Sequence, residues 1–372
     1  MNSSGKKNIL ILSHHEKYSQ NLIKCLNDSS QQYYLAGDCR NHPRIKKSKF
    51  FKQFIDIPKA CFEEVDENQH TLESVLSIIE SQNIDVLVPS DFESLKFLAS
   101  FESNLSNKAK VVPLPDYQQI QLLDNKVKCC RFLDSKSVII PKTIYVENID
   151  EYKVEALKDI TFPVFVKSAF SAGGVGNCMI KDMAQLKSYL EMKRSSNEQL
   201  LIQEYIEGID YCFNAYAVQG EVKTWTTFRY IELDSNGSKG VFAQFVPDQA
   251  IIEESKRIIS LCNYTGPIVI DYRKDAISGT PYFIEINPRF GNNSHYSLVD
   301  GVNFINCGIS LAQNETVPPT GNGDAMWSCN LKRLFSAPIR KLDISAFYYI
   351  FKVGLPQLMA ELKRTRKING KF

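Results

Sequence analysis

The chain has 372 residues, of which 44% are hydrophobic and 23% are charged, and its formal net charge is +2. This length predicts two or three packed subdomains, and the near-neutral charge argues against a dedicated nucleic-acid-binding protein. The ten cysteines include no C-x-x-C pair, which indicates a reduced, cytoplasmic chain and neither a disulfide framework nor a zinc site. No apolar run is long enough for a signal-peptide core or a transmembrane helix.

Strands and helices alternate in the first 115 residues. Strands are expected at Asn8–Ser13, Tyr33–Gly37, Ile84–Pro89 and Lys110–Val112, and helices at Lys17–Asn27, Thr71–Ser81 and Phe92–Phe101. The alternation predicts an open parallel α/β domain, and such sheets bind ligands at the carboxyl ends of their strands. Candidates at those ends, each with a helix cap or a solvated loop as the alternative, are Ser13, His14, His15, Ser90, Asp91 and Glu93.

The next region predicts an α+β fold with mixed and antiparallel sheets. A helix over Asp116–Ser137 carries Lys126, and a buried strand over Phe162–Ser168 ends on Lys167 and a serine. Because a lysine in an apolar strand needs an anionic partner, and because glycines let backbone N–H groups approach an anion, an anion site is expected here. These glycines lie in the loop that follows Lys167, and a plain flexible hairpin is the alternative explanation for that loop. Its candidate anion-binding residues are Ser168, Ser171, Gly173 and Gly174.

A further strand, Leu200–Tyr205, ends in a short glycine-containing turn before the strand Tyr211–Val218. Its edge offers unpaired backbone groups to a planar ring, and Asp210 beyond the turn could accept hydrogen bonds from sugar hydroxyls. An ordinary turn explains the same residues. The candidates on the strand edge are Gln203, Glu204, Tyr205 and Ile206.

The most informative stretch is GPIVIDYRKDAISGTPYFIEINPRFGNNS, residues 266–294. Two β-rich runs flank a turn at Ser278, and a hairpin symmetric about that serine sets Asp271 opposite Glu285. Asn287 shares the face of Glu285 because side chains alternate along a strand. Two opposed carboxylates repel, and carboxylate and amide oxygens suit Mg²⁺, so the hairpin predicts a metal site. A surface hairpin with solvated acids is the alternative.

These motifs, in the order Lys126, Lys167 with its glycine loop, QEYIEGIDY and D…EINPRFG, resemble the ATP-grasp superfamily. Within it the chain is most similar to the carbamoyl-phosphate-synthetase-like carboxylate–amine ligases, which include D-alanine–D-alanine and D-aspartate ligases. The resemblance implies a parallel α/β pre-ATP-grasp domain (1–115), a lid subdomain (116–198) and a central subdomain with the metal site (199–315). A basic helical extension (316–372) would follow.

The resemblance also implies roles for the candidates. Lys126 and Lys167 would hold ATP phosphates under the closing glycine loop, residues 203–206 would line the adenine pocket, and Asp210 would contact the ribose. Mg²⁺, or Mn²⁺ in its place, would be bound by Asp271, Glu285 and Asn287. Arg289 would steady the transferred phosphoryl group.

Two departures from the family pattern matter. Val269 stands where the D-alanine ligases are expected to have an arginine, so Arg229 and Lys239 are candidate substitutes, with a solvated strand charge as the alternative for each. His295 would face the acceptor site and is otherwise a loop histidine.

The expected function is an ATP- and Mg²⁺-dependent ligase that joins a small-molecule carboxylate to an amine through an acyl phosphate and releases ADP. The alternative is a catalytically silent nucleotide-binding regulatory protein of the same fold. A homodimer is the family-based expectation. The tail, with Phe347–Leu362 and KRTRK at Lys363–Lys367, is expected to pack on the body, and contact with an anionic membrane is the less favoured alternative.

Overall fold

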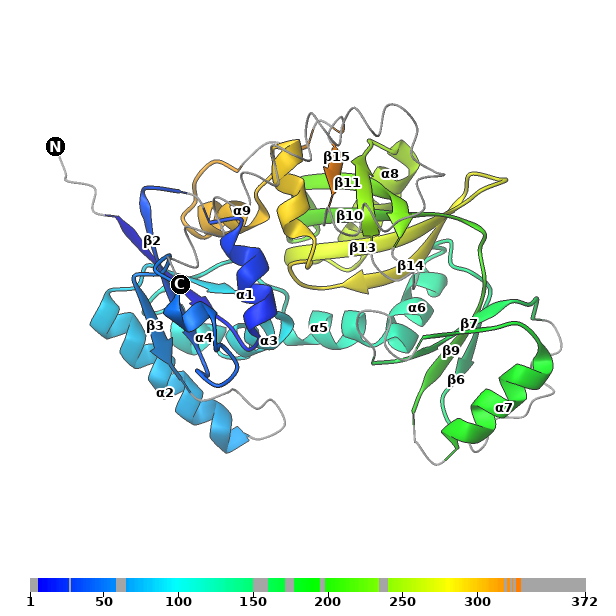
Figure 1. Cartoon of the computed structure of the whole chain (residues 1–372), viewed down its shortest axis with the longest axis horizontal. Helices are drawn as coiled ribbons and strands as arrows, with labels where there is room; N and C mark the ends of the chain where they lie inside the picture. Colours follow the sequence, from blue (N-terminus) through cyan, green and yellow to red (C-terminus); the bar gives the residue numbers. More distant parts are fainter. Residues whose placement is uncertain are drawn as a thin grey trace.

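The computed structural model describes residues 6–26, 28–57, 65–149, 160–170, 177–194, 198–233, 240–317, 320–321, 323 and 326–328. Within these residues the chain forms a five-stranded, a four-stranded and a six-stranded sheet (Figure 1). The candidate residues Ser171, Gly173, Gly174 and Lys239 and the basic tail lie outside the described part of the chain.

The N-terminal domain is the predicted open parallel α/β sheet. Its strands β1 (Lys7–Leu12), β2 (Gln31–Gly37), β3 (Gln53–Asp56), β4 (Val86–Pro89) and β5 (Lys110–Val111) follow the order β3-β2-β1-β4-β5 and are all parallel. The helices of the domain are α1 (Glu16–Ile23), α2 (Val65–Gln82), α3 (Phe92–Ser100) and α4 (Glu102–Leu105). The strand order reverses between β1 and β4, which is where open α/β sheets form a ligand crevice.

Two helices, α5 (Tyr117–Asp124) and α6 (Lys126–Ser135), connect this domain to the rest of the chain. The sequence predicted a single helix over Asp116–Ser137, and this was wrong. Asn125 has extended backbone angles and its side chain accepts a hydrogen bond from the Lys128 N–H, so it ends one helix and caps the next. The break starts α6 at Lys126, and the backbone N–H of Lys126 donates to the Ala169 carbonyl beside β7.

The four-stranded sheet is antiparallel, with strands β6 (Thr143–Val146), β7 (Val164–Ser168), β8 (Cys178–Ile180) and β9 (Leu200–Glu204) in the order β6-β9-β7-β8. Helix α7 (Met183–Lys193) contacts β8, and Asp182 caps its first turn. Apolar side chains such as Val164, Val166 and Leu186 form its core. In Figure 1 this subdomain lies at the end of the molecule away from the N-terminal domain.

The six-stranded sheet is also antiparallel and follows the order β14-β13-β10-β11-β12-β15. Its strands are β10 (Gly208–Val218), β11 (Glu221–Leu233), β12 (Gly240–Phe245), β13 (Gly266–Asp275), β14 (Pro281–Asn287) and β15 (Met326–Ser328). Helix α8 (Gln249–Leu261) covers one face, where Phe213, Ile270 and Tyr272 are buried. The other face carries Asp271 and is flanked by the 3₁₀ helix η3 (Ser294–Asp300).

Helix α9 (Phe304–Ala312), which the sequence did not predict, contacts both β4 and β10. Its side chains Phe304, Ile305 and Ile309 belong to the same hydrophobic cluster as the N-terminal strands. The chain therefore returns from the central sheet to close the core of the N-terminal domain. No helix in the described ranges is long and apolar enough to cross a bilayer.

Candidate active site

The opposed acids of the β13–β14 hairpin have the predicted register. Asp271 pairs with Glu285, and Val269 pairs with Asn287, as a hairpin symmetric about Ser278 requires. One irregularity follows, since a bulge after Asp271 shifts the pairing so that Tyr272 faces Phe283. The acids, which lie on the same face of the sheet, are next to each other because strands β13 and β14 are neighbours.

Asn287 and Arg289 complete this group. The Asn287 Nδ2 donates to Glu285 Oε1 at 3.0 Å and lies 3.5 Å from Asp271 Oδ2, while Arg289 Nη2 donates to Asn287 Oδ1 at 2.8 Å. The two carboxylates thus converge on one amide. They fit a hard cation such as Mg²⁺, which would take the place between them if Asn287 turned its oxygen toward the acids.

The two predicted phosphate-binding lysines lie beside these acids, although they come from different elements. Lys126, at the start of α6, has its Nζ 3.8 Å from Glu285 Oε2. Lys167, on β7, is only 7% exposed, and burial lowers its pKa, which the charge of Glu285 partly opposes. No ion pair or hydrogen bond of the Lys167 amino group is found among the described residues. A buried ammonium in this position suits an anionic ligand.

Asp271 is in an unfavourable position for a charged carboxyl. Burial and the nearby charge of Glu285 raise its pKa to about 7, and Arg289 acts in the opposite direction. Cys212, directly across from Asp271 on β10, is fully buried, and burial raises the pKa of its thiol, with Asp271 adding to the effect. The site therefore favours a bound cation over two free negative charges.

The predicted base- and ribose-binding residues are held together by an arginine that the sequence analysis did not single out. Arg273 on β13 pairs in register with Asp210 on β10, and its Nη1 donates to Asp210 Oδ1 at 2.7 Å. Its Nη2 donates to the Tyr205 hydroxyl at 2.8 Å, and its Nε donates to the Ile206 carbonyl. Alternation could have revealed it, because Arg273 lies two residues after Asp271 on the same face.

Gln203 and Glu204 lie at the end of β9, and their side chains are engaged within the small sheet. The Gln203 amide donates to Thr143 Oγ1 at 2.9 Å, and Glu204 Oε1 accepts from the Thr161 N–H at 2.9 Å. The expected free strand edge is not observed at this pair, because β9 lies between β6 and β7 and is paired with both. The buried Gln203 Oε1 has no hydrogen-bond partner among the described residues. Ser168 is at the end of β7, next to Lys167.

Arg229 does not reach the carboxylate group. It pairs in register with Tyr211, which in turn pairs with Tyr272, so it lies on the sheet face opposite to Asp271. Its guanidinium donates twice to Gln244 Oε1, at 3.0 and 2.8 Å. The prediction that Arg229 replaces the missing arginine is therefore not supported by its position, whereas Arg289 contacts Asn287 of the predicted metal site.

His295 lies at the start of η3, against the N-terminal domain. Its Nε2 is 3.4 Å from the Lys24 Nζ at the end of α1, and its ring packs edge-on against Tyr296. Burial, and then the charge of Lys24, lower its pKa well below the usual range. The ring is thus neutral and sits at the junction of the two domains, which is where an acceptor substrate is expected.

At the carboxyl ends of β1 and β4, the helix-cap alternative applies to Asp91. Its carboxylate accepts from the Ser94 N–H at 2.9 Å and from the backbone N–H groups of His14 and His15 at 2.6 and 3.1 Å. It therefore caps α3 and ties the two strand ends together. Ser13 is also used structurally, since its hydroxyl is 2.9 Å from His42 Nε2.

A second group of charges at this junction involves Asp124, which the sequence analysis missed. Asp124 ends α5, and burial raises its pKa while the charges of Lys96, Lys126 and Arg289 oppose that effect. Lys96 belongs to α3 of the N-terminal domain and pairs with Glu93 at 2.9 Å. No hydrogen bond or ion pair of the Asp124 carboxylate is found in the described part of the chain. Sequence alone gives no signal for this cluster, because it assembles from α3, α5 and the segment after β14.

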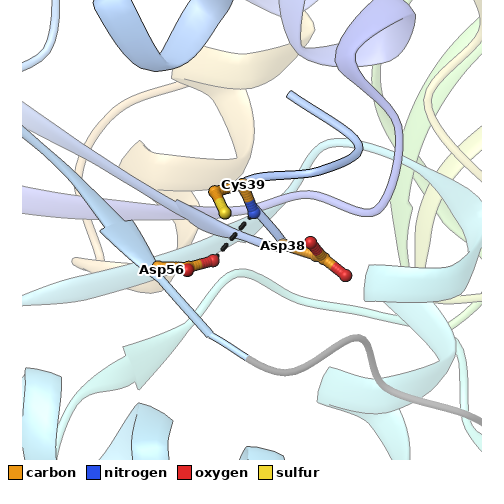
Figure 2. A group of neighbouring side chains, drawn as sticks. All are labelled: Asp38, Cys39 and Asp56. Atoms are coloured by element: carbon orange, nitrogen blue, oxygen red, sulfur yellow. Dashed lines mark hydrogen bonds between the residues drawn. The ribbon is translucent and has the colours of Figure 1, made fainter. Parts of the chain in front are cut away.

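Asp38, Cys39 and Asp56, after β2 and at the end of β3, bring three metal-ligand atoms within 4.8 Å of one another (Figure 2). Their local bonds explain the cluster without an ion. Arg40 binds the Asp38 carboxylate at 2.6 Å and holds its pKa below the usual range, and hydrogen bonding to Asp56 raises the pKa of the Cys39 thiol. A cation there would compete with Arg40 for Asp38 and would need a thiolate that this setting disfavours.

Comparison with known proteins identifies the class to which this site belongs. Residues 123–293, which include both lysines and the predicted metal-site residues, match the family model described as an ATP-grasp domain. This region therefore matches an ATP-grasp domain, and the resemblance predicted from its motifs is confirmed for these residues.

Curated relatives are carbamoyl phosphate synthase large chains. The chain is 26% identical over 253 residues to that of Methanobrevibacter smithii, an alignment covering 60% of this chain and 22% of the relative. It is 24% identical over 271 residues to that of Clostridium perfringens, covering 69% of this chain and 25% of the relative. The chain thus spans about a quarter or less of the length of these relatives.

Similar solved structures agree on the fold. The biotin carboxylase domain of the Hydrogenobacter thermophilus 2-oxoglutarate carboxylase, in complex with MgADP, ADP and bicarbonate, has a TM-score of 0.64 at 15% identity, covering 86% of this chain and 73% of that one. The L-amino acid ligase of Bacillus licheniformis has a TM-score of 0.61 at 17% identity, covering 84% and 75%. At these identities the likeness establishes the fold alone.

Proposed function

We propose that the protein is an ATP- and Mg²⁺-dependent ligase that joins a carboxylate to an amine, with ADP and phosphate as the other products. The proposal rests mainly on one observation, the convergence of Asp271, Glu285 and Asn287 beside Lys126 and Arg289. Such a set fits a metal-bound triphosphate, and a nucleotide is also the substrate that the ATP-grasp family implies.

In the proposed reaction an oxygen of the substrate carboxylate attacks the γ-phosphorus of ATP. The bond from that phosphorus to the bridging oxygen breaks, and ADP leaves with the electron pair. The amine nitrogen then attacks the acyl carbon, the carbon–oxygen bond to phosphate breaks, and the ammonium proton passes to solvent. The chain itself would act by holding charges in place, since no protein nucleophile is required.

Each charged residue has a task in this scheme. Bound Mg²⁺ would neutralise phosphate charge, held by Asp271, Glu285 and Asn287. Lys126 and Lys167 would bind phosphate oxygens, which would also compensate the buried ammonium of Lys167. Arg289, already oriented by Asn287, would donate to the phosphoryl group in transfer and to the acyl phosphate.

Small-molecule carboxylates and amines are the proposed substrates, and amino acids or peptides are the first class to test. Bicarbonate belongs in the same screen, because a biotin carboxylase domain shares the fold. A homodimer stays a prediction, which the solution mass of the protein would test. Neither nucleic acid nor a membrane is part of the proposed activity.

The test is ADP release from ATP with amino acids, dipeptides and bicarbonate as carboxylates, with hydroxylamine as a small amine. Hydroxylamine traps an acyl phosphate as a hydroxamate, which mass spectrometry identifies. Asp271→Asn and Glu285→Gln are expected to reduce ADP release by about two orders of magnitude or more, since each removes a charge held near the transferred phosphoryl group. AMP in place of ADP would contradict the mechanism. Tight nucleotide binding without turnover on any substrate would favour the regulatory alternative.

A further inference from the structure

Arg273 joins two parts of the molecule that the sequence separates by about 65 residues. Its three guanidinium nitrogens each have a different acceptor: the Asp210 carboxylate, the Tyr205 hydroxyl and the Ile206 carbonyl. Its guanidinium carbon also lies 4.9 Å from the centroid of the Tyr205 ring. The side chain is 21% exposed, so these contacts are largely shielded from solvent.

Two of these acceptors, Tyr205 and Ile206, belong to the segment that connects the four-stranded sheet to the central sheet. This segment leaves β9 at Glu204 and enters β10 at Gly208. Arg273 itself belongs to β13, two residues after Asp271 and on the same face, with about 6–7 Å between their Cα atoms. One strand therefore carries both a residue of the metal centre and the residue that fixes the connecting segment.

We propose that Arg273 is a positioning residue. It holds the connecting segment, which would bind the base, and the Asp210 carboxylate, which would bind the ribose, at a fixed distance from the metal centre. This inference rests on the proposed function, since it assumes that residues 203–206 and Asp210 receive a nucleotide. Arg273 sets the peptide plane that follows Ile206 and with it the direction of the backbone groups facing the base. It also occupies Oδ1 of Asp210 and leaves Oδ2 to accept from a ribose hydroxyl.

The chemistry requires an arginine. A guanidinium has donors that diverge in one plane, so it can hold a carboxylate, a hydroxyl and a carbonyl together and stack on a ring. A lysine has a single nitrogen and could keep the charge beside Asp210 without holding the segment. Charge and geometry can therefore be separated by substitution.

The neighbouring residue offers a matched control. Lys274 follows Arg273 on β13 but lies on the other face, where it pairs with Asp248 and approaches the Tyr211 ring. Lys274→Ala removes a partly buried charge from the same strand without touching the connecting segment. Its effect measures general damage to β13.

The experiment is calorimetric binding of Mg²⁺·ADP, Mg²⁺·GDP and the 2′- and 3′-deoxy forms of ADP to the full chain. Loss of charged hydrogen bonds predicts binding of Mg²⁺·ADP weaker by about tenfold or more in Arg273→Ala, and a smaller preference for adenine over guanine. Arg273→Lys is expected to retain discrimination against the deoxy forms, through Asp210, without regaining the preference for adenine. Lys274→Ala is expected to stay within about twofold of the unaltered chain.

Four outcomes would overturn the inference. These are unchanged affinity and base preference in Arg273→Ala, an equal loss in Lys274→Ala, recovery of base preference in Arg273→Lys, and loss of the deoxy discrimination in Arg273→Lys.

If Arg273→Ala does not fold, Tyr205→Phe removes only one acceptor and is expected to lower the base preference in the same direction. Because the readout is nucleotide binding, a chain that binds Mg²⁺·ADP but ligates nothing would refute the proposed function alone. A chain that does not bind Mg²⁺·ADP would refute both.

Discussion

Replacing Asp271 by asparagine is expected to stabilise the protein when no metal is present. The carboxyl of Asp271 lies across from Glu285, and burial together with that charge raises its pKa from 3.8 to about 7. Asparagine has nearly the same shape and no charge. The variant therefore removes the repulsion between this carboxylate and Glu285, which a bound cation would relieve in the native chain.

The size of the effect follows from the geometry. One Asn287 nitrogen lies 3.0 Å from Glu285 Oε1 and 3.5 Å from Asp271 Oδ2. The two oxygens are thus at most ~6.5 Å apart, and at an effective dielectric constant of about 20 two full charges at that distance repel by about 2.5 kcal/mol. Solvent, Arg289 and Lys126 reduce this value, so a gain of about 1–2 kcal/mol is expected, or roughly 2–8 °C in Tm.

The pH dependence has a definite sign. Because the folded state holds the Asp271 proton more tightly than the unfolded state does, it is the more protonated state between about pH 4 and 7. Stability from this group is therefore lost as pH rises through that window and is lowest above pH 7. Asp271→Asn lacks this loss of stability. The variant is therefore expected to be more stable than the native chain at pH 8, and this difference should vanish below pH 4. Mg²⁺ is expected to stabilise the native chain at pH 8 and to have little effect on the variant.

The assay is thermal unfolding at pH 5 and pH 8, in EDTA and in Mg²⁺. Asp275→Asn is the matched control, because Asp275 lies on the same strand and its pKa is lowered by hydrogen bonds from Ser278 and Ile277. That variant is expected to lose stability in both buffers without altering the Mg²⁺ response. The reasoning would be refuted if Asp271→Asn were less stable than the native chain in EDTA at pH 8, or if Mg²⁺ stabilised both equally.

Two further predictions concern the junction of the N-terminal domain with the central sheet. Asp124→Asn is expected to raise KM for the amine by about tenfold with KM for ATP unchanged, because it removes an anion close to Lys96 and Arg289 that can bind an ammonium. Steady-state kinetics with each substrate varied in turn would test this. Equal changes in the two KM values would contradict it. His295→Asn is expected to flatten the loss of stability below pH 6.5, because the buried native ring has a lowered pKa and the unfolded chain takes up the proton first. Unfolding followed between pH 5 and 7 would show the same slope in both proteins if this were wrong.

The sequence was sufficient to predict strand pairing where one face of the strand is buried. The pairing of Asp271 with Glu285 followed from the alternation of side chains and the position of the turn, because a slip of one residue would turn the buried Ile270 outward. The bulge after Asp271 was not predictable in this way. It leaves the pairing of Asp271 with Glu285 unchanged and shifts only the part of the hairpin nearer the turn.

Residues whose role depends on tertiary placement were beyond the reach of those patterns. Arg229 looked like a suitable cation, but the register between β10 and β11 sets it on the Tyr272 face, away from Asp271. The break at Asn125 was hidden because apolar spacing continues from one helix into the next. Asp124 meets Lys96 only after α5 has packed on α3, and nothing local in either segment signals that meeting.

Strand β13 explains how the site can carry several charges without disrupting the sheet. Its side chains alternate, so Ile270 and Tyr272 enter the core under α8 while Asp271 and Arg273 face the site. Tyr272 is 1% exposed and its hydroxyl receives a hydrogen bond from Ser255 of α8 at 2.9 Å, which fixes the strand from behind. Because that anchoring is independent of the charged face, substitutions at Asp271 or Arg273 should change ligand binding more than they change the sheet, and it is this separation that makes the binding experiments interpretable.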